Sequence, residues 1–156
     1  HPAGVGAWGP YSLELEGALR GRGMQDATSQ KVIRGRVLVV DDEPVLLMLV
    51  CQILRLDHEV DGTTDPRDAF ARVERGERYD VILCDLVMPG MTGMELHGRI
   101  RQSWPDVAQR MIFLTAGAFT EEAGRFLDSG AVVWFEKPID PDRLRAFIAA
   151  RVAALH

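Results

Sequence analysis

The sequence has only two cysteines among its 156 residues, and they do not form a CxxC pair. Cys51 and Cys84 both lie inside apolar segments, so we interpret them as buried thiols of a reducing compartment rather than as a disulfide framework. No apolar run approaches the length of about 18 residues that a membrane-spanning helix needs. No cleavable signal pattern opens the chain either. We therefore expect a cytoplasmic protein without membrane insertion.

An excess of basic side chains is also missing. The net charge is −5, from 18 Lys and Arg residues against 23 Asp and Glu residues. A surface that binds nucleic acid needs clustered basic residues to neutralise phosphates. We therefore expect no direct contact with nucleic acid. The hydrophobic content of 47% is sufficient for one core of ordinary size.

The first part of the chain differs in composition from the rest. Residues 1–35 contain seven of the 15 glycines and few aliphatic side chains, so they cannot bury enough apolar surface to fold alone. We expect a linker or N-terminal extension there and one domain over residues 36–156. The alternation over residues 11–16 suits a strand added to a sheet edge, while residues 12–20 equally suit a short helix. The tail and the final helices could support a homodimer.

From residue 36 onward, short apolar segments alternate with longer segments that begin with helix signals. The helix signals are Pro44, Asp65 before Pro66, the capping box from Thr92 to Glu95, Thr120, and Asp140 before Pro141. Strands that alternate with helices in this way imply right-handed crossovers and a parallel sheet with helices on both faces. The expected strands span residues 37–40, 59–63, 81–85, 111–115 and 132–135.

Polar side chains stand at the ends of four of these apolar segments. Asp41 and Asp42 follow the first, Asp85 ends the third, Thr115 ends the fourth, and Lys137 follows the fifth. Because the carboxyl ends of parallel strands share one edge of the sheet, we expect these side chains to meet in one crevice. Carboxylates at that density repel one another unless a hard divalent cation lies between them. The pattern therefore indicates Mg²⁺ and phosphoryl chemistry.

Asp85 is the candidate nucleophile of this crevice. A carboxylate at the tip of a buried strand can attack phosphorus and become an acyl phosphate when the phosphoryl oxygens are neutralised. Asp41 and Asp42 would supply anionic metal ligands. The hydroxyl of Thr115 and the ammonium of Lys137 can contact the phosphoryl oxygens.

Four motifs occur in order, namely V-V-D-D-E-P, D-L-V-M-P-G-M-T-G, L-T-A and F-E-K-P. With them, residues 36–156 resemble the receiver domain of bacterial two-component signalling. The stretches G-M-T-G-M-E-L-H and T-A-G-A-F-T are most similar to receivers of hybrid histidine kinases. The resemblance implies an α/β fold, a flavodoxin-like doubly wound five-stranded parallel sheet with strand order 2-1-3-4-5. It also implies a signalling switch that receives its phosphoryl group from a histidine kinase or histidine phosphotransfer protein and catalyses only its own phosphorylation and dephosphorylation.

The resemblance also implies roles for individual residues. Asp85 would be the phosphoacceptor. Asp42, Asp85 and the backbone carbonyl of Val87 would hold Mg²⁺, with Asp41 acting mainly through water. Lys137 would bridge to the phosphoryl group.

The resemblance further implies a switch in which Thr115 moves toward the phosphoryl group, followed by an aromatic side chain. Trp134 stands where the family usually has tyrosine or phenylalanine, and its larger ring is less free to rotate in a packed site. We weigh two roles for it, packing and anchoring a partner, and favour packing. Pro138 resembles the cis-linked proline of the family.

Two other functions remain as alternatives. Asp61, Gly62 and Thr63 match part of the nucleophile motif of haloacid-dehalogenase-like phosphatases, although the aspartate expected before them would have to be Glu59. The second alternative is a receiver-shaped interaction module that no longer takes phosphate. The complete set of five polar residues argues against it. The remaining titratable candidates, His58 and His97, lack metal-ligand spacing and are expected at the surface.

Overall fold

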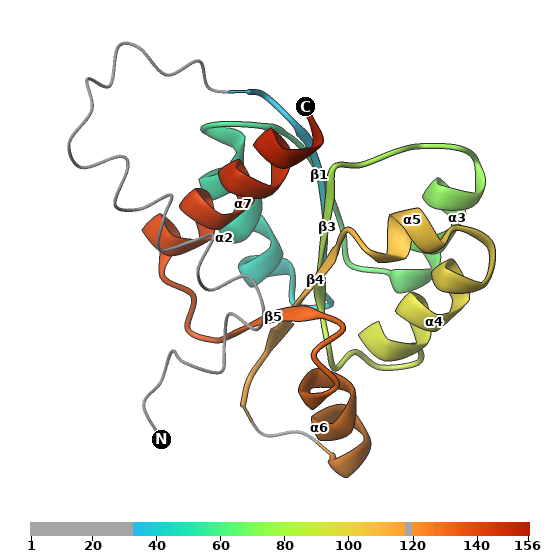
Figure 1. The fold of residues 1–156 in the computed structure, drawn as a ribbon. Coiled ribbons are helices and arrows are strands. Elements are labelled where there is room, and N and C mark those ends of the chain that lie inside the picture. Colours follow the sequence, from blue (N-terminus) through green and yellow to red (C-terminus); the bar gives the residue numbers. More distant parts are fainter. Residues whose placement is uncertain (1–32, 118–119) are drawn as a thin grey trace.

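The computed structural model describes residues 33–117 and 120–156, which form an α/β unit of three layers (Figure 1). A central sheet of five parallel strands has the order β2-β1-β3-β4-β5, as predicted. Both interpretations of residues 11–20 concern a segment outside the described residues. The strands are β1 (Arg36–Val40), β2 (Glu59–Thr63), β3 (Val81–Asp85), β4 (Met111–Thr115) and β5 (Val133–Glu136).

Helices cover both faces of this sheet. On one face lie α2 (Pro44–Arg55) and α7 (Pro141–Leu155), and the opposite face carries the other helices (Figure 1). Among the described residues, no helix combines the length and the apolar character that a membrane crossing requires. The helices of the second face are α3 (Pro66–Glu74), α4 (Gly93–Ser103), α5 (Pro105–Ala108) and α6 (Glu121–Asp128).

The predicted helix signals act through side-chain caps. The carboxylate of Asp65 accepts a hydrogen bond from the backbone N–H of Arg67 at 2.9 Å, at the start of α3. The Thr92 hydroxyl accepts one from the N–H of Glu95 at 3.1 Å, at the start of α4. Thr120 and Asp140 cap α6 and α7 in the same way. A cap of this kind stabilises a helix by about 1 kcal/mol, so the short helices begin where the sequence indicates.

Burial follows the position of each strand in the sheet. Every side chain of β3 and β4 is buried, as expected for central strands that helices cover on both sides. The two edge strands, β2 and β5, each expose one or more residues. The apolar residues of the central strands divide between two cores, one beneath α2 and α7 and one beneath α3 to α6.

The structure differs from the predictions in several details. Pro105 begins the short helix α5, which the helix signals of the sequence did not include, and proline is accepted in the first turn of a helix. β5 begins at Val133 rather than at residue 132, and its last residue, Glu136, pairs with Thr115. His58 is fully buried, so its expected surface position was wrong. Its Nδ1 accepts a hydrogen bond of 3.1 Å from the N–H of Gly35, where the chain enters the domain.

The predicted surface position of His97 was also wrong. His97 is half-buried on α4, between two aromatic rings. Its ring centroid lies 5.8 Å from that of Phe113 and 5.4 Å from that of Phe126, with edge-to-face geometry in both pairs. The imidazole therefore serves as a packing group between α4, β4 and α6.

Candidate functional site

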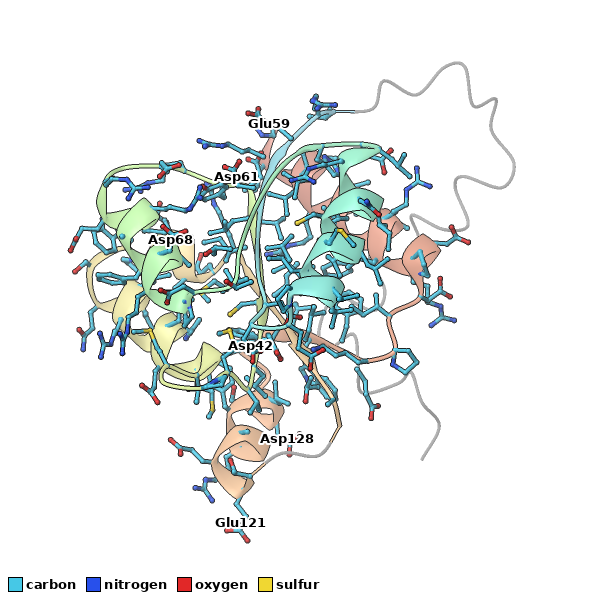
Figure 2. The ribbon with its side chains drawn as sticks, turned by 180° about the vertical axis from the view of Figure 1, so that it is seen from behind. Asp42, Glu59, Asp61, Asp68, Glu121 and Asp128 are labelled. Carbon is cyan, nitrogen blue, oxygen red and sulfur yellow. The ribbon has the colours of Figure 1, made fainter. Side chains whose placement is uncertain are left out.

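Three carboxylates meet at the carboxyl edge of the sheet. Val40 of β1 pairs with Cys84 of β3, so the residues that follow them, Asp41 and Asp85, lie side by side. One oxygen from each of Asp41, Asp42 and Asp85 lies within 4.8 Å of the others. Figure 2 shows Asp42 at this end of the sheet, opposite Glu59 at the start of β2. The structure thus brings together the carboxylates that the sequence assigned to a metal.

Within the part of the chain that the structure describes, one ammonium faces this cluster. The Nζ atom of Lys137 lies 3.5 Å from Asp41 Oδ2 and 3.5 Å from Asp85 Oδ2. The backbone N–H of Lys137 donates a hydrogen bond of 2.8 Å to the carbonyl of Thr115, which fixes the lysine at the end of β4. The following peptide bond, to Pro138, is cis, as the family resemblance implied.

Burial controls the electrostatics of the site. Asp41 and Asp85 are 1% and 6% exposed. Loss of solvent raises the pKa of Asp85 to about 6. The positive charge of Lys137 lowers this pKa, and the repulsion of Asp41 raises it further. Burial also raises the pKa of Asp41, although the Glu43 N–H donates a hydrogen bond of 2.9 Å to its carboxylate. One lysine does not neutralise three carboxylates, so the site favours an added cation.

The donor set suits a small, hard cation. Carboxylate oxygens are the ligands that Mg²⁺ and Ca²⁺ prefer, and Mg²⁺ needs only one or two of them besides water and phosphate oxygens. Asp42 is half-buried, so it keeps access to solvent while Asp41 and Asp85 lie deeper. The geometry therefore fits a cation that enters from the Asp42 side and contacts Asp85.

Thr115 and Val87 border the carboxylates. Thr115 is 1% exposed, and its hydroxyl accepts a hydrogen bond of 3.3 Å from the N–H of Gly117. The N–H of Val87 donates to Asp85 Oδ1 at 3.4 Å, while the Val87 side chain is 56% exposed. The Thr115 hydroxyl is thus engaged by its own loop.

Trp134 lies further from the carboxylates. It is half-buried and packs against the core beneath α3 to α6. Its partner across the strands is Phe113 of β4. These contacts agree with the packing role that we favoured, and they place the ring on the same face of the sheet as α6.

The sequence interpretation missed an apolar groove beside the site. The groove has a volume of about 630 Å³ and lies between α2 and the segment that joins β5 to α7. Lys137 and Ala116 belong both to its wall and to the neighbourhood of the carboxylates. The signal was present in α2, whose sequence PVLLMLVCQILR is more apolar than one buried helix face requires.

A five-stranded parallel sheet that collects carboxylates and a lysine at its carboxyl edge defines a CheY-like α/β module. The family model of the response regulator receiver domain matches residues 37–149. The chain therefore belongs to the response regulator receiver family of two-component signalling, as its motifs predicted. Receiver domains are signalling switches that interact with histidine kinases or phosphotransfer proteins, and they generally bind Mg²⁺ at an acidic pocket.

Similar proteins contain this domain in different settings. The chain is 35% identical over 142 residues to the transcriptional regulatory protein TcrA of Mycobacterium tuberculosis (strain ATCC 25618 / H37Rv), which covers 81% of this chain and 54% of that protein. It is 33% identical over 122 residues to hybrid signal transduction histidine kinase L of Dictyostelium discoideum, which covers 73% of this chain and 7% of that protein. The chain thus spans about half, or less, of the length of these relatives.

Solved structures show the same fold. The CheY-like response regulator receiver domain protein from Methanospirillum hungatei JF-1 superposes with a TM-score of 0.68 at 26% identity, covering 78% of this chain and 96% of that one. The chemotaxis response regulator CheY4 of Vibrio cholerae gives a TM-score of 0.63 at 28% identity, covering 76% of this chain and 99% of that one.

Proposed function

We propose that this chain takes a phosphoryl group onto Asp85 from a histidine kinase or a histidine phosphotransfer protein. The observation that carries the proposal is the position of Asp85. Its carboxylate is nearly buried, has an oxygen within 4.8 Å of an oxygen of each of two other carboxylates, and faces the ammonium of Lys137 at 3.5 Å. A carboxylate in such a setting is held as a nucleophile while its charge is balanced by neighbours.

Each residue of the site has its own role in the phosphoryl transfer. An Asp85 oxygen bonds to phosphorus, the bond from phosphorus to the donor nitrogen breaks, and its electron pair remains on the donor imidazole. Asp42, Asp85 and the carbonyl of Val87 would hold Mg²⁺, with Asp41 acting through water, and the cation neutralises phosphoryl oxygens when bound. Lys137 exchanges its contact with Asp85 for a contact with a phosphoryl oxygen.

The output of the switch starts at Thr115. We infer that the Thr115 hydroxyl leaves the N–H of Gly117 and contacts the phosphoryl group, which carries about −1.5 to −2 charges. The start of α6 then moves, and the surface formed by α6, β5 and α7 changes its affinity for a partner. Trp134 packs beneath this surface and would respond to the movement. Residues 36–156 would be the receiver domain and residues 1–35 its extension, and the chain would act in the cytoplasm without catalysing the turnover of a separate substrate.

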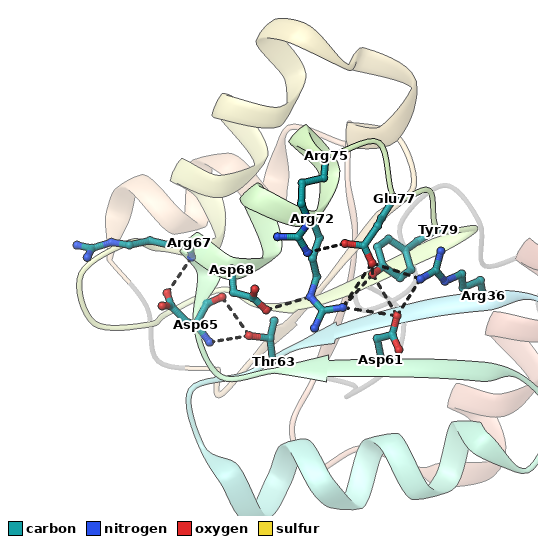
Figure 3. A network of polar contacts seen from close by, with 10 residues as sticks. All are labelled: Arg36, Asp61, Thr63, Asp65, Arg67, Asp68, Arg72, Arg75, Glu77 and Tyr79. Atoms are coloured by element: carbon teal, nitrogen blue, oxygen red, sulfur yellow. Dashed lines mark hydrogen bonds and ion pairs between the residues drawn. The ribbon is translucent and has the colours of Figure 1, made fainter.

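The geometry disfavours the phosphatase alternative. The motif would place its nucleophile at Glu59 and its second carboxylate, the general acid, at Asp61, and Asp61 lies in a polar network on the side of α3 (Figure 3). It accepts hydrogen bonds of 3.2 Å from Arg36 and 3.2 Å from the Tyr79 hydroxyl, and it pairs with Arg72 at 3.6 Å. A carboxylate with these partners is a structural ion-pair group, and a general acid would have to give them up.

Labelling with acetyl phosphate and Mg²⁺ tests the proposed function. We expect one acid-stable, base-labile phosphate per chain and none in Asp85→Asn. The exposed Asp128→Asn is the matched control and should label like the parent. Absence of label in the parent would leave only the interaction module, whereas multiple turnover of phosphomonoesters would indicate the phosphatase.

A further inference from the structure

Glu136, the last residue of β5, lies beside the segment that carries the Thr115 hydroxyl. In the sheet, Glu136 pairs with Thr115 of β4, and two residues earlier Trp134 pairs with Phe113. Trp134 and Phe113 both pack in the core beneath α3 to α6. Because side chains alternate between the two faces of a sheet, Thr115 and Glu136 project on this same face.

Gly117 locates the carboxylate of Glu136. Gly117 has a φ of +89°, a conformation that favours glycine, and a Cβ atom at this position would collide with Glu136 Oε1. The carboxylate therefore occupies the space that a side chain at position 117 would fill. The N–H of the same glycine donates the hydrogen bond of 3.3 Å to the Thr115 hydroxyl. The Glu136 carboxylate thus contacts the residue that holds this hydroxyl.

The contact with Gly117 directs the carboxylate toward Asp85. β4 lies between β3 and β5, and Gly117 follows β4, so a glutamate of β5 that reaches Gly117 extends over the end of the intervening strand. The strands β3 and β5 are two strand spacings apart, which is about 10 Å. An acyl phosphate on Asp85 extends into this interval from one side, and the Glu136 carboxylate extends into it from the other. The remaining distance suits a single water molecule between the two groups.

Glu136 also has the chemistry that its neighbours lack. Among the described residues at this border of the site, Val87, Ala116 and Gly117 have no side chain that can accept a proton. The three clustered carboxylates face the proposed cation. Glu136 is exposed, and its carboxylate forms no ion pair with another residue of the described ranges. It is therefore open to water from the solvent side.

We propose that Glu136 accepts the proton of the water that hydrolyses the acyl phosphate on Asp85, and thereby sets the lifetime of the phosphorylated state. This inference rests on the proposed function. The water oxygen bonds to phosphorus, the bond from phosphorus to the Asp85 oxygen breaks, and its electron pair returns to the Asp85 carboxylate. The proton of the water passes to Glu136 and from there to solvent, and inorganic phosphate leaves.

The variant Glu136→Gln keeps the shape of the side chain and removes the proton acceptor. A positioned base contributes about 10²- to 10⁴-fold to a rate, but the loose transition state of phosphoryl transfer needs less help from a base than most reactions. We therefore expect the phosphorylated state of Glu136→Gln to hydrolyse about tenfold more slowly than that of the parent. The rate of labelling should not change, because Glu136 acts on the attacking water.

Loss of label from the phosphorylated chain measures this effect. The full chain is labelled with ³²P-acetyl phosphate and Mg²⁺, separated from the donor, and followed by the first-order loss of label. Glu121→Gln alters an exposed carboxylate in the first turn of α6 and should lose its label at the parent rate. Equal rates for the parent and Glu136→Gln overturn the inference and leave the proposed function intact. A parent that takes no label overturns the proposed function, and this inference with it.

Deuterated solvent separates proton transfer from a structural role. When Glu136 accepts the proton during hydrolysis, the parent loses its label more slowly in D₂O than in H₂O. The ratio of the two rates is then smaller in Glu136→Gln. Slower hydrolysis in Glu136→Gln with an unchanged ratio would show that Glu136 only holds Gly117 in place, and would overturn the inference.

Discussion

Lys137 Nζ lies 3.5 Å from Asp85 Oδ2, so an ammonium that follows β5 contacts the carboxylate at the tip of β3. The same nitrogen lies 3.5 Å from Asp41 Oδ2. One positive charge is therefore shared between two nearly buried carboxylates, and the carboxylate of Asp42 lies close by. Burial of the carboxylate is the main reason why the pKa of Asp85 rises to about 6 although a lysine is adjacent, and the repulsion of Asp41 adds to it.

The first prediction concerns the pH dependence of stability. The pKa of Asp85 is raised from 3.8 to about 6, so the folded state binds more protons than the unfolded state between these values. Stability from this group is therefore complete below about pH 4 and decreases as pH rises through about 6. We expect Asp85→Asn to raise the free energy of unfolding at pH 7.5 by on the order of 1–3 kcal/mol, and to have little effect at pH 4.

Denaturant unfolding in Mg²⁺-free buffer at both pH values measures this difference. Asp128→Asn, which alters an exposed carboxylate on α6, should change stability by less than about 0.5 kcal/mol at either pH. Equal effects of Asp85→Asn at pH 4 and pH 7.5 would contradict the electrostatic explanation.

The second prediction concerns Mg²⁺. At a free concentration tenfold above its Kd, a ligand that binds only the folded state stabilises it by about 1.4 kcal/mol, which raises Tm by about 5 °C for a domain of this size. Asp42→Asn replaces a charged ligand by a neutral one and should lose most of this rise. Asp65→Asn is the control, because asparagine also caps a helix and Asp65 caps α3. Thermal unfolding with and without Mg²⁺ measures both variants, and an equal rise in the two would place the cation elsewhere.

The third prediction concerns Trp134. It packs on the face of the sheet that α6 covers, so movement of α6 should change its fluorescence when a beryllofluoride mimic binds. Trp104 contacts Phe70, with ring centroids 5.9 Å apart, in the region of α3 and α5. We expect Trp134→Phe to abolish the fluorescence change and Trp104→Phe to retain it. Retention of the full change in Trp134→Phe would show that α6 and β5 do not carry the output.

The sequence predicted the fold well because each boundary has a local cause. Asp65, Thr92, Thr120 and Asp140 cap helices through their own side chains, so the start of each helix depends on a few adjacent residues. The order of the strands followed from the family resemblance. The convergence of Asp41 with Asp85 followed from a general rule, that parallel strands end at one edge.

The features that were missed depend on contacts between distant segments. His58 is buried because Gly35, at the entrance to β1, lies against it. A single-sequence pattern does not show this, since the residues directly before and after His58, Asp57 and Glu59, are charged. The groove beside Lys137 is equally non-local, because α2 and the segment after β5 form its opposite walls. The apolar composition of α2 indicated excess apolar surface but not where that surface lies.

The last prediction concerns His58, whose effect on stability changes with pH in the opposite direction to that of Asp85. Because Nδ1 accepts the Gly35 N–H, the neutral ring carries its proton on Nε2, and burial lowers its pKa from 6.5. The charges around it are Asp57 and Asp80, which raise the pKa, and Arg34, which lowers it further. Stability from the neutral ring is therefore present above pH 6.5 and is lost as pH falls through the lowered folded pKa.

The pH ranges over which Asp85 and His58 change the stability overlap. The pH dependence of stability is therefore measured in a protein that already carries Asp85→Asn. There we expect stability to fall between pH 7 and pH 5, and to fall less when His58→Gln is added, because the glutamine oxygen can accept the Gly35 N–H without titrating. His97, whose pKa burial also lowers, is present in both proteins and contributes equally. Parallel stability curves for the single and double variants would show that protonation of His58 does not limit the stability of the domain in acid.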